Sequence, residues 1–165
     1  MSATPQRQLE IELRVNGTPV RRLAGVRQHL ADFLRDELEL TGTHLGCEHG
    51  VCGACSVLVN GEVVRGCLML AVQAQGAAVE TIEGLSESGA LAELQEAFYR
   101  HNAAQCGYCT PGMLLTAHQL LRRERASSRA EIREYISGNF CRCTGYHAIV
   151  DAIEAAFGTR KAKAR

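Results

Sequence analysis

The 165-residue chain has no tryptophan, few aromatic residues, only three prolines and no long apolar run. No stretch approaches the roughly 20 apolar residues that a membrane-spanning helix requires. Residues 1–9 are polar and lack the apolar core of a secretory signal, so we expect a cytoplasmic protein. The 18 basic and 18 acidic side chains cancel, which argues against a nucleic-acid binder, because such proteins usually carry a basic surplus.

The sequence also lacks the motifs of several enzyme classes. It contains no phosphate-binding P-loop and no arrangement of nucleophile and base that indicates covalent catalysis. We therefore expect no substrate turnover from this chain alone. The histidines fall at no metal-ligand spacing, and we assign none of them as ligands. They are His29, His44, His49, His101, His118 and His147.

Cysteine, by contrast, is abundant, and all eight cysteines fall into two groups of four. The first group reads C-x4-C-x2-C with a fourth cysteine after eleven residues, and the second reads C-x2-C followed after 31 residues by C-x-C. The opening C-x4-C-x2-C is the spacing of plant-type [2Fe–2S] ferredoxins. Two different four-thiolate sites suggest two redox centres in series. The first group is Cys47, Cys52, Cys55 and Cys67, and the second is Cys106, Cys109, Cys141 and Cys143.

Three other roles for these cysteines compete with iron–sulfur ligation. Disulfides require an oxidising compartment, and closely spaced segments such as CGAC and CRC suit metal ligation better. A Rieske centre requires two histidine ligands, whereas the C-x-H of Cys47 and His49 is followed by no C-x2-H. Zinc is the strongest rival, because C-x2-C pairs are common zinc half-sites. Three ligands in one loop are nevertheless unlike a zinc ribbon, which usually brings two pairs from two turns.

Up to residue 82 the pattern is one of strands and turns. Residues 9–15 alternate apolar and polar side chains, which predicts a strand, and Asn16-Gly17 predicts a hairpin turn. Residues 26–38 place apolar side chains on one face and predict a helix. A small mixed sheet crossed by one helix indicates a β-grasp, ferredoxin-like domain over residues 1–82, followed by a linker at 83–90. The other predicted strands are 20–23, 54–59, 62–65 and 78–82, with a second Asn-Gly turn at 60–61.

From residue 91 onward the pattern is helical. Four predicted helices, at 91–100, 110–121, 128–138 and 144–158, form a four-helix bundle. The fold class is therefore α+β, with a helical domain over 91–165 that ends in a disordered tail at 161–165. The predicted N-terminal caps are Thr110, Thr144 and the capping box of Ser128 with Glu131, with Pro111 at a first helical position and Gly138 and Gly158 at helix ends.

Each cysteine group lies in a loop with a distinct local chemistry. Gly46, Gly50 and Gly53 interrupt the first group, and glycine permits the φ > 0 backbone that wraps N–H groups around sulfur. The second group lies at two predicted helix N-termini, whose partial positive charge favours thiolates. Arg142, between two cysteines, either adds positive charge there or is a solvated side chain of little effect.

Four segments carry a resemblance to a known family. Residues 46–55 (GCEHGVCGAC), 66–72 (GCLMLAV), 105–113 (QCGYCTPGM) and 138–145 (GNFCRCTG) resemble the iron–sulfur subunit of molybdenum hydroxylases, the xanthine oxidase and carbon monoxide dehydrogenase superfamily. The resemblance extends over about residues 8–157. It implies a ferredoxin-like domain and a four-helix domain, each holding one [2Fe–2S] cluster on one of the cysteine groups.

The resemblance also implies partners. In this family the helical-domain cluster lies beside a molybdopterin cofactor held by a large subunit, and the residues matching Gln105 and Cys143 contact the pterin. The other cluster passes electrons to an FAD-binding medium subunit or an external acceptor. The resemblance therefore implies an electron-transfer subunit of a heteromeric molybdenum hydroxylase. We expect Tyr108, Gly112 and Met113 to face the large subunit, although a helical methionine can equally fill the core.

Two functions of other classes compete with this interpretation. A standalone two-cluster ferredoxin would work as a shuttle by itself, but the net charge of zero argues against docking by charge. A zinc-stabilised interaction module would be colourless. The sequence does not identify the substrate of the complex.

Overall fold

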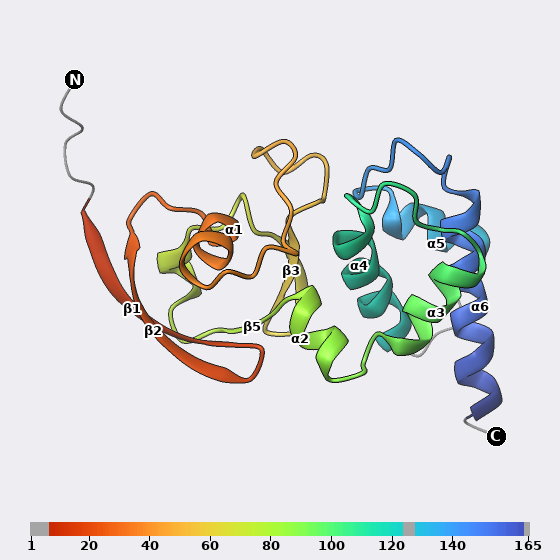
Figure 1. Cartoon of the computed structure of the whole chain (residues 1–165), viewed down its shortest axis with the longest axis horizontal. Helices are drawn as coiled ribbons and strands as arrows, with labels where there is room; N and C mark the ends of the chain where they lie inside the picture. Colours follow the sequence, from red (N-terminus) through yellow and green to blue (C-terminus); the bar gives the residue numbers. More distant parts are fainter. Residues whose placement is uncertain (1–6, 124–127, 164–165) are drawn as a thin grey trace.

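The computed structural model describes residues 7–123 and 128–163. A sheet-containing unit and a helical unit lie side by side, with α2 and α4 between them (Figure 1). None of the helices in these two ranges is long and apolar enough to cross a membrane. The elements are β1 (Gln8–Val15), β2 (Thr18–Gly25), α1 (Leu30–Asp32), the π-helix η1 (Phe33–Glu37), β3 (Ser56–Val59), β4 (Glu62–Arg65), the 3-10 helix η2 (Ala71–Ala74), β5 (Ala78–Glu80), α2 (Ile82–Glu87), α3 (Ala92–Arg100), α4 (Thr110–Arg122), α5 (Arg129–Ile136) and α6 (His147–Lys163).

The sheet is mixed, with strand order β2-β1-β5-β3-β4. β1 runs antiparallel to β2 and parallel to β5, and β3 runs antiparallel to both β4 and β5. Both hairpins turn at the predicted Asn-Gly pairs, with φ of 50° and 80° at Asn16 and Gly17 and of 52° and 85° at Asn60 and Gly61. Two consecutive positive φ angles are what a tight hairpin turn of this type requires. The predicted α+β class and the sheet are confirmed.

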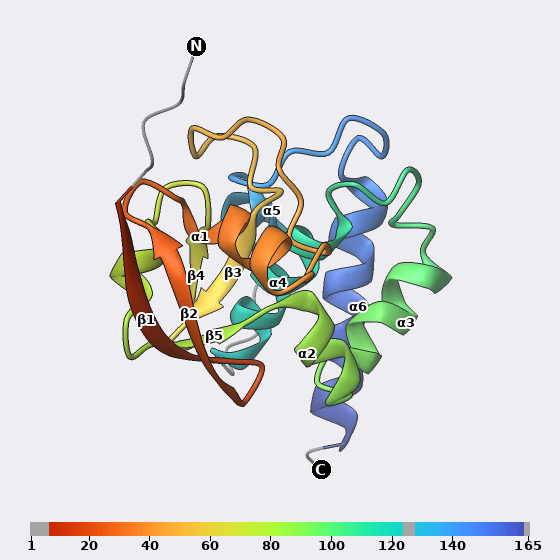
Figure 2. The same ribbon diagram turned by 60° about the vertical axis from the view of Figure 1, so that its left-hand side comes forward.

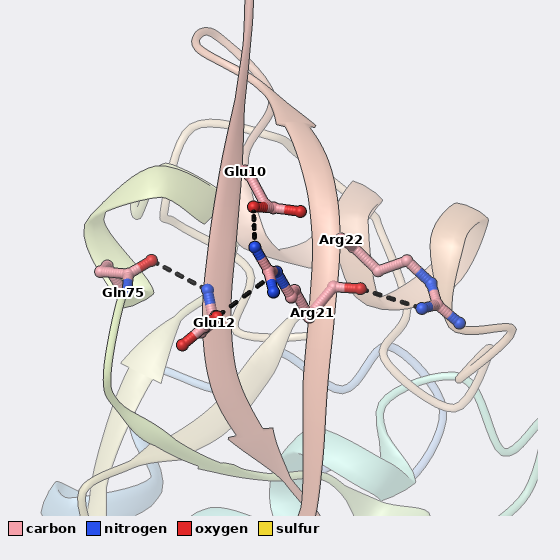
Figure 3. A network of polar contacts seen from close by, with 5 residues as sticks. All are labelled: Glu10, Glu12, Arg21, Arg22 and Gln75. Atoms are coloured by element: carbon pink, nitrogen blue, oxygen red, sulfur yellow. Dashed lines mark hydrogen bonds and ion pairs between the residues drawn. The ribbon is translucent and has the colours of Figure 1, made fainter.

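The hairpin of β1 and β2 has a polar outer surface (Figure 3). Arg21 on β2 contacts Glu10 at 2.5 Å and Glu12 at 3.4 Å on β1. The hydrogen bond from Arg21 lowers the pKa of Glu10. The Gln75 side chain accepts a hydrogen bond from the Glu12 N–H at 2.9 Å. Exposed ion pairs of this kind contribute little stability, so the register of this hairpin rests mainly on its backbone pairing.

Strand β3 is buried on both faces and joins the two units. Val57 and Val59 pack in the core of the sheet unit with side chains such as Phe33 of η1. Leu58 points the other way and packs in the helical core with residues such as Met113 of α4. Figure 2 shows α4 beside β3. Because one strand belongs to both cores, the position of the sheet unit relative to the helices is fixed by packing.

The predicted helix at 26–38 begins later than expected. Residue 29 instead pairs with Leu70 in an isolated β-bridge, and the His29 side chain accepts a hydrogen bond from the Asp32 N–H as the cap of α1. The helix then continues as the π-turn η1, which apolar periodicity cannot distinguish from an α-helix. The segment predicted as a linker, 83–90, contains most of α2, and Leu85 of α2 is buried in the helical core. The boundary between the two domains stays a prediction.

The capping box of α5 is confirmed, whereas the predicted start of α4 and the predicted glycine cap of α5 differ. Ser128 and Glu131 exchange hydrogen bonds in the reciprocal pattern. Thr110 is the first residue of α4 and not its cap, which is Cys109. Gly138 follows the end of α5 without a left-handed backbone. It lies instead against Arg65, since a Cβ there would lie 2.6 Å from a guanidinium nitrogen of that flexible side chain.

The start and end of α6 also differ from the prediction. Gly145 and Tyr146 have φ of 64° and 69°, which is incompatible with a helix starting at Thr144. The Thr144 hydroxyl instead accepts a hydrogen bond from the Tyr146 N–H at 3.1 Å. The helix continues past Gly158 to Lys163. Most of the predicted disordered tail at 161–165 is therefore helical, and its last two residues lie outside the described part of the chain.

Candidate cysteine metal centres

The two cysteine groups lie on loops at the same end of the molecule. The first group occupies the loop before β3, with Cys67 following β4, and the second occupies the loop before α4 and the loop between α5 and α6. These loops lie together at the upper edge of Figure 1, above β3 and the start of α4. The folding of two separate units thus brings sequence-distant cysteines to one edge.

In the first group the cysteines form two pairs. The Cys52 N–H donates a hydrogen bond to Cys47 Sγ at 3.3 Å, and the Cys55 and Cys67 thiols are in hydrogen-bonding contact. Cys55 and Cys67 are buried, whereas Cys47 and Cys52 are partly exposed. Backbone N–H groups of Cys52 and His49 lower the pKa of Cys47 to about 6. Burial, with the Cys67 thiol in contact, raises the pKa of Cys55 to about 11.

The second group is also divided into an inner and an outer pair. Cys109 and Cys141 are in contact, with Cys141 buried and Cys109 partly exposed, and burial raises the pKa of Cys109 to about 12. Cys106 and Cys143 form the outer pair and are exposed, and the contact with Cys106 raises the pKa of Cys143. The Thr144 hydroxyl donates to Cys141 Sγ at 3.1 Å. Thr144 therefore contacts a cysteine of the second group directly, although it does not cap α6 as the sequence predicted.

Within each site the thiols fall into two contacting pairs that also lie near each other, since Cys52 helps to raise the pKa of Cys55 and Cys106 that of Cys109. A [2Fe–2S] cluster contains two irons, each held by two protein ligands. Two pairs of thiols per site fit the two-iron donor set.

Glycine makes the first loop possible in two different ways. Gly50 and Gly53 have φ of 85° and 75°, as the sequence predicts. Gly46 has no positive φ, but a Cβ there would lie 3.0 Å from Cys52 Sγ. Gly46 is therefore explained by close approach to a sulfur rather than by backbone conformation.

The residues predicted to face a partner divide into two sets. Gln105 and Cys143 are exposed near the outer thiols, and Tyr108 is 49% exposed. Gly112 and Met113 are buried, and Met113 packs in the helical core, so the expectation that these two form a partner surface is wrong. Arg142 is exposed, and its charge is therefore largely screened by solvent.

His44 has a structural role that the sequence did not reveal. Its ring stacks on that of Tyr108, with centroids 4.7 Å apart, and its Nδ1 lies 2.7 Å from the Tyr108 carbonyl oxygen. The Tyr108 hydroxyl donates to the Leu45 carbonyl. Tyr108 lies between two cysteines of the second group, and Leu45 lies just before the first, so these contacts tie the two loops together at the surface.

Comparison with known proteins gives matches over almost the whole chain. Residues 13–86 match a family described as the 2Fe-2S iron-sulfur cluster binding domain, and residues 81–154 match a [2Fe-2S] binding domain family. The gamma subunit of caffeine dehydrogenase from Pseudomonas sp. (strain CBB1) is 55% identical over 148 residues, covering 88% of this chain and 89% of the relative.

Two solved structures have the same fold. Quinoline 2-oxidoreductase from Pseudomonas putida 86 matches with a TM-score of 0.87 and 50% identity, over 93% of this chain and 97% of the matched chain. Aldehyde oxidoreductase from Desulfovibrio gigas matches with a TM-score of 0.85 and 38% identity, over 94% of this chain but only 17% of the matched chain. The same two-unit structure thus occurs both as a separate subunit-sized chain and as part of a much longer one.

Proposed function

Because the chain belongs to the iron–sulfur subunits of the molybdenum hydroxylases, we propose that it conducts electrons out of a molybdopterin site on a large partner subunit. The route is through two [2Fe–2S] clusters toward an FAD-binding subunit or an external acceptor. The chain is a subunit of a molybdenum-dependent oxidoreductase, and the proposal concerns the path that electrons take through it.

The observation that carries this proposal is the pairing of the eight thiols. Cys47 with Cys52 and Cys55 with Cys67 would hold the two irons of the first cluster. The second cluster would be held by Cys106 with Cys143 and by Cys109 with Cys141. When bound, each cluster would accept and release one electron. The protein supplies burial, N–H groups and hydroxyl groups around the sulfurs, which set the relative reduction potentials.

The exposed outer pair of the second site supports a direction for the path. Cys106 and Cys143 are exposed next to the exposed Gln105, so this rim is available to a partner. We assign Gln105 and Cys143 to the contact with the pterin of the large subunit. The first site has exposed Val51 and Leu68 beside its loop, and we assign this side to the flavin subunit or acceptor.

Anaerobic purification of the full chain, followed by iron, sulfide and zinc analysis, tests the proposal. We expect four iron and four sulfide atoms per chain, as two centres with distinct EPR signals, because the two sites differ in burial and hydrogen bonding. Stoichiometric zinc, or a single cluster, would refute it. Since the relatives are named for caffeine, quinoline and aldehyde substrates, a substrate panel for the complete complex should include N-heterocycles and aldehydes.

A further inference from the structure

The two cysteine loops are joined by one backbone hydrogen bond. The Phe140 N–H donates to the Cys52 carbonyl oxygen at 2.8 Å. Cys52 is a proposed ligand of the first cluster, and Phe140 immediately precedes Cys141, a proposed ligand of the second. A path from one sulfur to the other therefore runs through covalent bonds and a single hydrogen bond, without a through-space gap.

The Asn139 side chain stabilises the chain segments on both sides of this hydrogen bond. It is 1% exposed, and its Nδ2 donates to the carbonyl of Gly53, the residue after Cys52, at 3.1 Å. Its Oδ1 accepts from the Thr116 hydroxyl of α4 at 3.0 Å. A buried amide whose partners are removed is costly, so a satisfied one fixes local geometry. Asn139 thus fixes the chain next to each end of the link.

Two further features make the junction rigid. An Arg65 guanidinium nitrogen on β4 donates to the Gly138 carbonyl at 2.7 Å. The backbones also approach too closely for side chains, since a Cβ at Gly53 would lie 2.4 Å from the Gly138 carbonyl oxygen. A Cβ at Gly112 would lie 2.4 Å from the Gly53 carbonyl oxygen. Three segments from both units therefore meet backbone to backbone at this point.

The other connection between the loops is less direct. The hydrogen bond from the Tyr108 hydroxyl reaches Leu45, which is separated from Cys47 by a further residue, and this path also has to cross the whole Tyr108 side chain. The Cys52–Phe140 link starts at a proposed ligand, ends beside another and is backed by the buried Asn139. Electronic coupling falls with each additional bond along a path, so the shorter Cys52–Phe140 link is the better conductor.

We propose that the Cys52–Phe140 hydrogen bond is the electronic bridge between the two clusters, and that Asn139 is the positioning residue that keeps it formed. The inference rests on the proposed function. One electron would leave the site of Cys109 and Cys141, which is oxidised by one electron, and arrive at the site of Cys47 and Cys52, which is reduced by one electron. No covalent bond forms or breaks, and no proton is transferred.

Asn139→Ala in the full cluster-loaded chain tests the proposal, with Gln119→Ala as the matched control. Gln119 is also a buried amide across the junction of the two units, where its Nε2 donates to Glu62 at 2.6 Å, but it contacts neither cysteine loop. After rapid one-electron photoreduction, the redistribution of the electron between clusters is followed optically. We expect Asn139→Ala to slow it by roughly tenfold or more, as small misplacements do in geometry-dependent reactions, and Gln119→Ala to leave it unchanged.

Two readouts besides the rate separate positioning from general destabilisation. In Asn139→Ala the amide of Phe140 should exchange its hydrogen faster, and the spin–spin splitting in the EPR spectrum of the fully reduced protein should change. Both should stay at parental values in Gln119→Ala. Thr116→Val, which removes one partner of Asn139 but retains the side-chain shape, provides a second variant with a smaller effect in the same direction.

The outcomes distinguish this inference from the proposed function. Two intact clusters with a parental redistribution rate in Asn139→Ala or Thr116→Val, despite a faster-exchanging Phe140 amide, would overturn the bridge alone. Equal slowing in Gln119→Ala would also overturn it, because any loosening of the junction would then suffice. Metal analysis that finds no pair of clusters in the parent chain would instead overturn the proposed function.

Discussion

At the scale of single residues, exposure separates the two thiol pairs within each site. In the second site Cys141 is buried and Cys106 and Cys143 are exposed, so a cluster held there would present one side to the solvent or to a partner. In the first site Cys55 and Cys67 are the buried pair. An exposed redox centre exchanges electrons readily with a partner, whereas a buried ligand pair anchors the centre in its own fold.

Gln105 is the side chain that best tests the partner contact without disturbing the fold. It is exposed, so we expect Gln105→Ala in the complete complex to slow cluster reduction by substrate while the iron content stays unchanged. Stopped-flow measurement of that reduction is the appropriate experiment. Gln95→Ala on α3, an equally exposed glutamine bonded only locally to Ser86, serves as the control. Identical reduction rates in both variants would exclude a role for Gln105 at the pterin.

Two glycines in helices should respond to alanine in opposite ways. A Cβ at Gly112 of α4 would lie 2.4 Å from a backbone oxygen that cannot easily move, so we expect Gly112→Ala to lower the free energy of unfolding by about 1–3 kcal/mol. Gly158 of α6 has nothing within 4 Å of such a Cβ. Gly158→Ala should raise stability by about 0.5–1 kcal/mol. Chemical denaturation measures both, and a neutral Gly112→Ala would show that the junction is looser than the structure indicates.

The cysteine residues could be identified from the sequence, but their arrangement could not. Spacing assigned all eight to two groups, and the loop glycines were recognisable because cysteines flank them. The pairing of Cys106 with Cys143 depends on how two helix-connecting loops meet. Asn139 and His44 gave no signal, because an asparagine or histidine acquires its role from partners more than 60 positions away in the chain, such as Gly53 and Tyr108. Gly112 and Met113 were misassigned to the surface for the same reason.

At the scale of elements, α5 is a helix whose start is set by a local sequence pattern and whose end leads into the second cysteine site. Its capping box starts the helix at Ser128, and its end leads directly into residues 138–141 of the junction and second site. Arg129 of α5 also contacts Asp151 of α6 at 2.6 Å, although exposed pairs contribute little. The direction of α5 therefore determines where Asn139 and Cys141 lie.

Ser128→Ala should test how much this cap contributes. Loss of the hydrogen bond from the Glu131 N–H is expected to lower the free energy of unfolding by about 1 kcal/mol. For a chain of this size that corresponds to a decrease of about 2–4 °C in the melting temperature. Ser128→Asp retains an acceptor at the cap and should keep most of the stability. Equal losses in the two variants, measured by thermal unfolding, would mean that the cap hydrogen bond is not what holds the start of α5.

Elements with strong local signals were predictable, and those defined by tertiary contacts were not. The Asn-Gly hairpins and the Ser128 box specify their own geometry. The late start of α1 coincides with the bridge between His29 and Leu70, a contact between distant residues that no local pattern encodes. The short helix α2 forms where a polar segment predicted a linker, because Leu85 is buried against the helices.

At the scale of the whole molecule, β3 contributes side chains to the hydrophobic cores of both units. Leu58 belongs to the helical core and its neighbours Val57 and Val59 to the sheet core. Two units that would be small for independent stability therefore stabilise each other. Apolar side chains are exposed around the cysteine loops, where we propose that a partner binds. They are Val51, Leu68, Tyr108 and Phe140.

This distribution predicts how the chain behaves with and without the proposed large partner subunit. Co-expression with that subunit should raise the yield of soluble, cluster-loaded protein, because the partner covers the exposed rim of the second site and protects its outer thiols. The complex should reduce a dye in the presence of substrate, whereas the isolated chain should hold its clusters but show no such activity. Dye-reduction assays and size-exclusion chromatography of both preparations measure this. A monomeric chain that oxidised substrate by itself would contradict the assignment as a subunit.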